Sequence, residues 1–416
     1  NAKKWVLTFL LLALVLVLGL AAFNYVTDPF AAFGDKFLNW FSYDETNNPR
    51  VAKISYLEQH HDEYDSYILG CSSTSSLQVS DFNKLYDANF YNLIMYGADM
   101  RDCEKIADYL IEHYEVKHLV LNVYLDNGFT YDDETDRLTR NLHYLTDPDT
   151  SALSFYTRYL FCDPRYGFAK LKNLRNDRLL PQSFDVFNEV TGEYDKRVRD
   201  VEPIGSMDTY LEAYPVFADY PKTGDFVLGQ TENCMKSVAA IKERCEAADV
   251  ELVVVAAPVY IDYFQNFQAE DVANFYASLA KVTDFWDFSC SSVSCEPRYF
   301  YDATHFRNAV GSMIAARIAG DDSVYIPDDF GTYVTADTPS SYFSEVLQAT
   351  ALPDETVSRD VPVLMWHNLA EESSGDMTIS VDTFRAQIEA LHEAGFKTVS
   401  LQQLYDYVHF GTELPE

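Results

Sequence analysis

The feature that most constrains the fold is the segment at residues 250–257, which reads VELVVVAA and is followed by Pro258. A nearly continuous run of aliphatic and β-branched residues suits a strand that is buried on both faces, as in a parallel sheet. Helical patterns of apolar residues flank this strand at residues 231–247 and 269–282. This order of elements predicts an α/β sheet that is covered by helices.

The same alternation occurs elsewhere in the chain. Strand-like and helical patterns follow one another at residues 66–69, 89–96, 102–114, 118–124, 285–288 and 308–318. We therefore predict a doubly wound parallel-sheet domain over residues 24–330. This alternation of strands and helices is interrupted at residues 130–225, which contain helix-like pieces near 154–161 and 164–171. We expect an insertion over the rim of the sheet, where substrate-shaping segments usually lie, although a helical excursion that only covers the sheet fits the pattern equally.

An uncharged apolar run at residues 5–23 follows Lys3 and Lys4. At 1.5 Å per residue a helix of this length spans about 28 Å, close to the hydrocarbon thickness of a bilayer. We expect residues 1–23 to be a cytoplasmic tip and an uncleaved transmembrane anchor, with the rest of the chain outside the cell membrane. A cleaved signal peptide, with Ala21 and Ala22 near the cleavage site, is the alternative.

Charge and cysteine content exclude several functions. The 65 Asp and Glu residues outweigh 31 Lys and Arg, and the formal net charge is −34. This balance argues against nucleic-acid binding and against docking of the globular part on an anionic lipid surface. The seven cysteines are scattered without a C-x-x-C pair, which argues against a zinc cluster. Cys290 and Cys295 are close enough in sequence for a local disulfide.

The candidate catalytic residues are Ser72, Asp302 and His305. A short apolar strand leads into Gly70, whose freedom permits a sharp turn, and then into hydroxyl residues beginning at Ser72. His305 would accept the proton of the Ser72 hydroxyl, and Asp302, three residues earlier, would fix the imidazole tautomer. The alternatives are that residues 72–76 only cap a helix and that His305 is a surface or N-cap histidine.

Gly70-Cys-Ser-Ser-Thr74, with Asp302-x-x-His305 near the end of an α/β domain, resembles the SGNH hydrolase superfamily. The likeness is greatest to its membrane-anchored branch, which acts on bacterial cell-envelope polymers. It implies that Ser72 is the nucleophile and that its backbone N–H helps to form the oxyanion hole. It also implies further oxyanion donors at Gly97, after the second strand, and at an Asn of the third block. Asn122 is the candidate for that Asn, with Asn127 just past the strand, although the Gly-x-Asn-Asp block is absent and Cys71 replaces the usual Asp.

A second resemblance begins at Val361, after a predicted linker at residues 331–360. Val361-Pro-Val-Leu-Met-Trp-His-Asn368 and the apolar pattern that follows resemble the start of a polysaccharide deacetylase (NodB homology) domain, a β/α barrel. The periodicity itself predicts a strand, a helix at about 381–394 and a short strand. The family's divalent metal ligands would follow Glu416, so we expect a longer two-enzyme protein. His367 is expected to be structural, and no metal site is expected within residues 361–416.

These observations predict an extracytoplasmic, membrane-anchored serine esterase or O-acyl (acetyl) transferase that acts on a cell-envelope glycan. No cofactor is expected in the SGNH-like domain. Two alternatives remain open. In the first, the full protein is chiefly a metal-dependent polysaccharide N-deacetylase and the SGNH-like part is accessory. In the second, the chain is a non-catalytic glycan-binding scaffold.

Overall fold

A computed structural model of the chain describes residues 2–38, 47–129, 137–177, 186–196, 207–218, 222–345, 361–373, 377–410 and 414. The chain divides into two compact units. The first comprises Asn1–Ala319 and Pro327–Ala351, and the second comprises Gly320–Ile326 and Leu352–Glu416.

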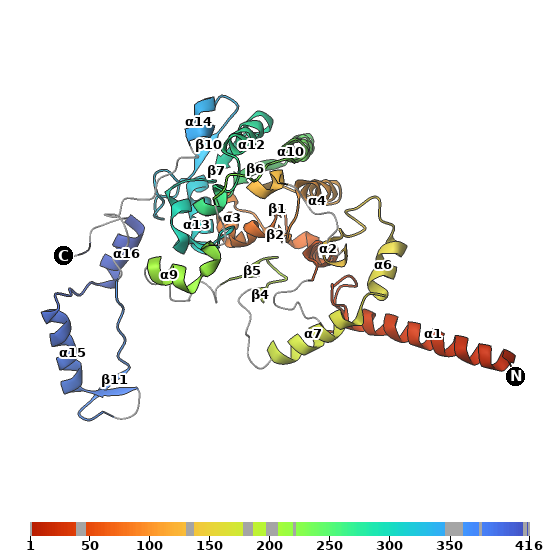
Figure 1. Ribbon diagram of the computed structural model, residues 1–416, viewed down its shortest axis with the longest axis horizontal. Coiled ribbons are helices and arrows are strands. Elements are labelled where there is room, and N and C mark those ends of the chain that lie inside the picture. The colour runs from red at the N-terminus through yellow and green to blue at the C-terminus, as the bar shows by residue number, and fades with distance from the viewer. Residues whose placement is uncertain are drawn as a thin grey trace. The chain divides into compact units, whose positions relative to one another are not determined.

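The first unit is built around a six-stranded sheet in the order β10-β7-β6-β3-β1-β2 (Figure 1). Its strands are β1 (Ser66–Gly70), β2 (Phe90–Ile94), β3 (His118–Val123), β6 (Glu251–Ala256), β7 (Phe285–Asp287) and β10 (Thr332–Val334). The first five are parallel to one another, and β10 pairs antiparallel with β7. The apolar strands are buried, as expected for a sheet with both faces covered.

Helices cover both faces of this sheet. They are α3 (Val79–Tyr86), α4 (Met100–His113), α10 (Thr231–Ala247), α12 (Ala269–Val282) and α13 (Asn308–Ala319). With right-handed crossovers, the strand order places α4, α10 and α12 on one face and α3 on the other. Contacts agree with this arrangement, because α10 packs against α4 and α12, whereas α13 packs against α3. The prediction of an α/β fold with a mostly parallel sheet is confirmed.

The sheet domain extends beyond the predicted boundary at residue 330. Residues 332–334, which we assigned to a linker, form the edge strand β10, and α14 (Ser340–Glu345) packs against α12. The Tyr342 hydroxyl also donates a 2.9 Å hydrogen bond to the Asp287 carboxylate at the end of β7. Residues 346–360 of the predicted linker lie outside the described residues.

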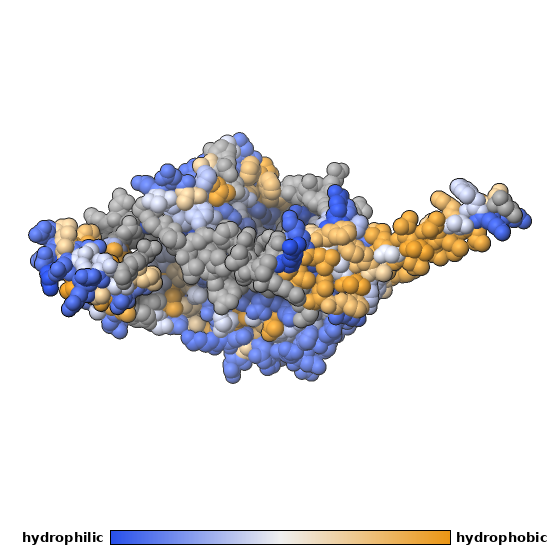
Figure 2. All heavy atoms as spheres, turned by 90° about the horizontal axis from the view of Figure 1, so that it is seen from below, coloured by the Kyte–Doolittle hydropathy of each residue, from blue (hydrophilic) through white to orange (hydrophobic). Residues whose placement is uncertain are grey.

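The apolar run near the N-terminus lies within one long helix, α1 (Ala2–Thr27). This helix is long and apolar enough to cross a membrane, and its large apolar side chains between Trp5 and Leu18 are exposed. In Figure 2 the apolar surface of α1 continues onto the body of the molecule at the point where the helix joins it.

The described parts of the insertion occupy three places. Helices α6 (Ala152–Leu160) and α7 (Pro164–Asp177) pack against α1 rather than over the sheet rim. The hairpin of β4 (Val186–Phe187) and β5 (Tyr194–Asp195) lies beside β2, where the Asn92 N–H donates to the Thr191 carbonyl at 2.9 Å. A third piece, α9 (Met207–Ala213), packs near residues 297–300, just before the predicted Asp302.

The second unit contains a pair of short parallel strands, β11 (Asn368–Ala370) and β12 (Thr378–Ser380), followed by α15 (Val381–Glu393) and α16 (Leu401–Phe410). The predicted helix is present as α15. The predicted strand begins later than expected, at Asn368, and residues 396–400 form no strand. The side chains of Val363 and Met365 are exposed. Residues 361–367 therefore lack the apolar packing that would stabilise them as a strand.

Candidate active site

Ser72 lies at the carboxyl edge of the sheet, where β1 ends at Gly70. The chain continues through Cys71 into a short 3-10 helix, η2 (Ser72–Ser76), held by a bond from the Thr74 N–H to the Cys71 carbonyl. Ser72 is only partly buried, whereas the other four residues of η2 are buried. The serines do not cap α3, because its N-cap residue is Gln78. The helix-cap alternative for these residues is therefore wrong.

Gly70 is required for space rather than for its backbone freedom. It is not among the glycines with a positive φ, so the sharp-turn explanation is wrong. A Cβ atom at this position would lie 2.1 Å from Thr74 Oγ1 and 3.0 Å from Asn122 Cβ. The absent side chain thus lets η2 fold back tightly over the end of β1.

The structure brings Asp302 and His305 together in a small hairpin of β8 (Phe300–Asp302) and β9 (His305–Phe306). His305 Nδ1 lies 2.8 Å from each oxygen of the Asp302 carboxylate. That carboxylate also accepts bonds from the backbone N–H groups of Thr304 and His305. Burial alone would raise the pKa of Asp302, but the bonds from His305 and Thr304 outweigh it and hold that pKa well below its usual value.

This geometry gives the imidazole a defined orientation. Because Nδ1 faces the Asp302 carboxylate, Nε2 is the nitrogen left for a reacting group, and it has no hydrogen-bond partner among the described residues. The side chain of His305 is 26% exposed, so a substrate can approach it. An aspartate that fixes the tautomer of a partly exposed histidine is the arrangement required of a general base.

The turn that carries Ser72 packs directly against the strand that carries His305. The Ser76 hydroxyl donates a 2.6 Å hydrogen bond to the Phe306 carbonyl and joins η2 to β9. Gly311 of α13 comes so near that a Cβ there would lie 1.7 Å from the Ser76 carbonyl oxygen. No hydrogen bond connects Ser72 to His305 within the described parts of the chain. Catalytic hydrogen bonds are often formed only in the complex with substrate.

A second carboxylate, Asp126, lies near the same histidine and was not predicted. It belongs to η3 (Leu125–Gly128), directly after β3, and the Tyr263 hydroxyl donates to its Oδ1 at 2.5 Å. Burial raises the pKa of Asp126 to about 6, while the Tyr263 bond and the charge of His305 act in the opposite direction. Its position after a parallel strand, at the same sheet edge as Ser72, is the signal that could have indicated it.

The two predicted oxyanion donors have different environments. Gly97, past the end of β2, is exposed and has a φ of +55°, and the Arg140 guanidinium lies beside it. Asn122 lies within β3 and is fully buried. Its amide donates to the hydroxyls of Ser73 at 2.8 Å and Thr74 at 3.1 Å. Both amide hydrogens are thus engaged in holding η2, which gives Asn122 a structural role. The role of Gly97 stays a prediction.

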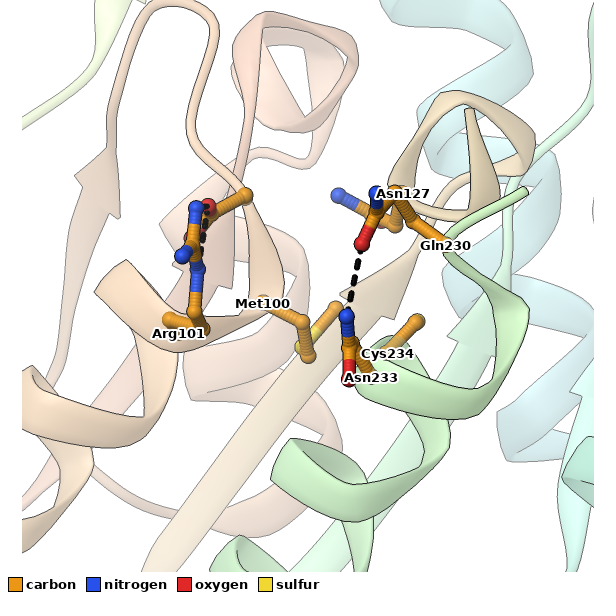
Figure 3. Close-up of a pocket in the computed structure, with 7 residues that line it drawn as sticks. Met100, Arg101, Asn127, Gln230, Asn233 and Cys234 are labelled. Carbon is orange, nitrogen blue, oxygen red and sulfur yellow. Dashed lines mark hydrogen bonds and ion pairs between the residues drawn. The ribbon is translucent and has the colours of Figure 1, made fainter. Parts of the chain in front are cut away.

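A pocket of about 260 Å³ opens at the same sheet edge, between the beginnings of α4 and α10 (Figure 3). Its walls are polar, and an Asn233 amide donates to the Gln230 side chain at 2.7 Å across its rim. Its lining residues are Asp99, Met100, Arg101, Asn127, Gln230, Asn233 and Cys234. Because neither Ser72 nor His305 lines it, this pocket is distinct from the candidate catalytic residues.

The cysteines offer no competing nucleophile beside Ser72. Burial raises the pKa of Cys71 to about 11, which keeps its thiol protonated at neutral pH. Cys290 and Cys295, which are close enough in sequence for a local disulfide, are both free thiols. Among the described residues, no group of three or more His, Cys, Asp or Glu side chains is placed to hold a metal ion.

In comparisons with known proteins, no protein-family model matches the chain and no curated protein matches it. The resemblances to SGNH hydrolases and to polysaccharide deacetylases therefore stay predictions from the motifs.

Proposed function

We propose that this protein is a membrane-anchored serine esterase or O-acyl transferase, with Ser72 as nucleophile, that acts on acetyl or similar small acyl groups of a cell-envelope glycan. The observation that carries the proposal is the Asp302–His305 pair, with Nδ1 2.8 Å from the carboxylate, on a hairpin packed against the turn of Ser72. The long apolar helix α1 supports a place at the membrane, and Lys3 and Lys4 before its apolar run favour a globular part outside.

In the proposed reaction, His305 Nε2 removes the proton from the Ser72 hydroxyl as Oγ attacks the acyl carbonyl carbon. The resulting imidazolium, stabilised by Asp302, then gives that proton to the departing alcohol oxygen as the ester bond breaks. In the second half, His305 deprotonates water or a sugar hydroxyl, which attacks the acyl-serine. The proton returns to Ser72, so hydrolysis and transfer differ only in the acceptor.

Two further groups contribute to the proposed mechanism. The backbone N–H groups of Ser72 and Gly97 are the expected oxyanion donors, and loss of one such donor typically costs about a hundredfold in rate. Asp126 lies near enough to His305 for their charges to interact. When ionised, it stabilises the imidazolium formed during proton transfer.

The runner-up is a non-catalytic glycan-binding scaffold with the same fold. It is favoured by the engaged amide of Asn122 and by the absence of a hydrogen bond between Ser72 and His305 among the described residues. The N-deacetylase alternative rests on the resemblance of residues 361–416 to the start of a deacetylase domain and requires a divalent metal.

Hydrolysis of an aryl acetate by the full chain in detergent tests the proposal. Ser72→Ala is expected to abolish turnover. Ser75→Ala removes a neighbouring buried hydroxyl that has no hydrogen-bond partner among the described residues, and it is expected to retain turnover. Equal turnover in the Ser72→Ala variant would refute the proposed nucleophile. No turnover in any form, together with binding of acetylated glycan, would favour the scaffold.

A further inference from the structure

Helix α7 (Pro164–Asp177) presents apolar side chains to solvent beside α1. Phe168 is 61% exposed and Leu171 is 36% exposed. Arg165, Lys172 and Arg175 are exposed as well and share this face of α7, each three or four positions from Phe168 or Leu171. Exposed apolar side chains accompanied by basic ones on the same helix face suit a helix that lies in the interface of a membrane, where the long basic side chains reach the headgroups.

The position of this strip relative to α1 is set by close contacts. The ring of Phe168 lies 4.7 Å from that of Phe23, at the end of the apolar run of α1. A Cβ atom on Gly167 would lie 2.6 Å from Thr27 Oγ1, so the two helices meet without an intervening side chain. In addition, the Asn24 amide of α1 donates to the carbonyls of Leu160 and Cys162, just before α7.

A buried ion pair fixes α7 to the segment that follows α1. Lys170 lies 2.7 Å from the Asp35 carboxylate, with side-chain exposures of 5% and 1%, and it donates to the Asp28 carbonyl at 2.8 Å. Lys170 is on the inner side of α7, so these bonds leave the Phe168 strip facing outward. The strip is thus held rigidly at the level where the apolar run of α1 ends.

The local charge differs in sign from that of the whole chain. Residues 137–177 contain seven Lys or Arg and four Asp, whereas the chain as a whole has a net charge of −34. The excess of negative charge therefore lies in the rest of the protein, and this segment is free to approach an anionic lipid surface. Basic residues near a membrane surface attract anionic headgroups.

We propose that α7 docks on the outer surface of the bilayer that α1 spans, with Phe168 and Leu171 inserted among the acyl chains and Lys172 and Arg175 at anionic headgroups. The apolar surface of α1 continues onto the body at their junction in Figure 2, in agreement with one continuous lipid-contacting surface. The proposal rests on α1 being the membrane anchor. Its consequence is that the globular domain is held at a fixed orientation above the membrane rather than tethered loosely.

The test uses the full chain in vesicles of phosphatidylcholine and phosphatidylglycerol in equal parts. The variants Phe168→Cys, Val15→Cys and Ala336→Cys each carry an environment-sensitive fluorophore, and six of the seven native thiols are buried. Val15 reports on α1. Ala336 is exposed beyond β10, at the opposite side of the first unit from α1, and is the solvent control. Nitroxide lipids quench any label that enters the bilayer. A chain without an added cysteine corrects for Cys295.

We expect quenching at positions 15 and 168 to be several-fold stronger than at 336. We also expect the charge-reversed pair Lys172→Glu with Arg175→Glu to weaken quenching at 168 in these vesicles but not in pure phosphatidylcholine. Quenching at 15 with none at 168 overturns the docking of α7 while leaving the anchor intact. Loss of quenching at both positions overturns the anchor. Iodide, a quencher dissolved in the water, distinguishes a further case. If the label at position 168 is shielded from iodide but is not quenched by nitroxide lipids, a protein surface covers it, and this outcome also refutes the proposal.

Discussion

The Ser76 hydroxyl donates a 2.6 Å hydrogen bond to the Phe306 carbonyl, across 230 residues of sequence. This bond connects the turn that begins with the proposed nucleophile Ser72 to the strand that begins with the proposed base His305. Both partners are fully buried, so water cannot replace either group. This contact therefore helps to set the relative position of the two segments.

Ser76→Ala is expected to lower kcat about tenfold, with a smaller change in KM, because the buried Phe306 carbonyl loses its donor at a cost of about 1–3 kcal/mol. The matched control is Ser75→Ala, which removes from the same turn a buried hydroxyl that bonds to no group in the described parts of the chain, and it should change kcat little. Steady-state kinetics with an aryl acetate measures both. Equal effects of the two substitutions would show that the Ser76–Phe306 bond does not position the site.

Asp302→Asn is expected to reduce kcat/KM by roughly a thousandfold or more, because the amide no longer holds His305 in the required tautomer. Glu251→Gln provides the control, since Glu251 accepts from His118 Nδ1 at 3.0 Å in a comparable pair at the opposite end of β3 and β6. It should leave kcat/KM unchanged. Full activity of the Asp302→Asn variant would exclude a role for this carboxylate.

Asp126→Asn is expected to change how stability depends on pH. The pKa of Asp126 is raised to about 6 in the folded state, so the protonated carboxyl contributes stability in acid that is lost as the pH rises through 6. The variant should therefore gain up to about 3 kcal/mol relative to the wild type between about pH 4 and pH 7. Chemical unfolding of both proteins across this range measures the difference.

Asp65 supplies a control of opposite sign for the Asp126 experiment. Burial acts to raise its pKa, but hydrogen bonds from Lys117 and the Asn89 N–H outweigh this effect and lower it. Its ionised form contributes stability at neutral pH that is lost as the pH falls into the acid range. Asp65→Asn should therefore be less stable than the wild type at neutral pH and approach it in acid. If the stability difference from the wild type changed with pH in the same direction for Asp65→Asn and Asp126→Asn, the opposite pKa shifts of the two carboxyl groups would be contradicted.

Lys170→Met is expected to destabilise the first unit by about 3–5 kcal/mol, because it leaves the buried Asp35 carboxylate without its cation. Lys236→Met removes a lysine from an exposed pair with Glu232 and should cost less than about 1 kcal/mol. Thermal unfolding of both variants in the same detergent compares them. Similar losses in the two variants would mean that the Lys170–Asp35 pair does not fix α7.

The sequence predicts the sheet well where its pattern is long or strongly apolar. The helices at residues 231–247 and 269–282 have the predicted bounds, because many turns of one-sided apolar spacing define them. The edge strand β10 was missed because three residues, two of them exposed, carry no pattern that distinguishes a strand from a linker. Its strand character comes from pairing with β7, which only the tertiary structure supplies.

The candidate site is predictable only in part. Asp302 and His305 are three residues apart, so their hydrogen bond follows from local spacing. The structural role of Asn122 could not be predicted, because it depends on which face of β3 the side chain occupies and on what lies above it. Asp126 was missed for a similar reason, since its proximity to His305 spans 179 residues and is created by the strand order.

The central claim is that Ser72 is a nucleophile activated by His305. Reaction of the full chain with a fluorophosphonate, followed by peptide mass spectrometry, tests it most directly, because this reagent forms a stable adduct with an activated serine. We expect one adduct, on Ser72, that is lost in the Ser72→Ala and His305→Ala variants and retained in Ser75→Ala. An adduct on another residue, or no adduct on the folded wild-type protein, would contradict this account.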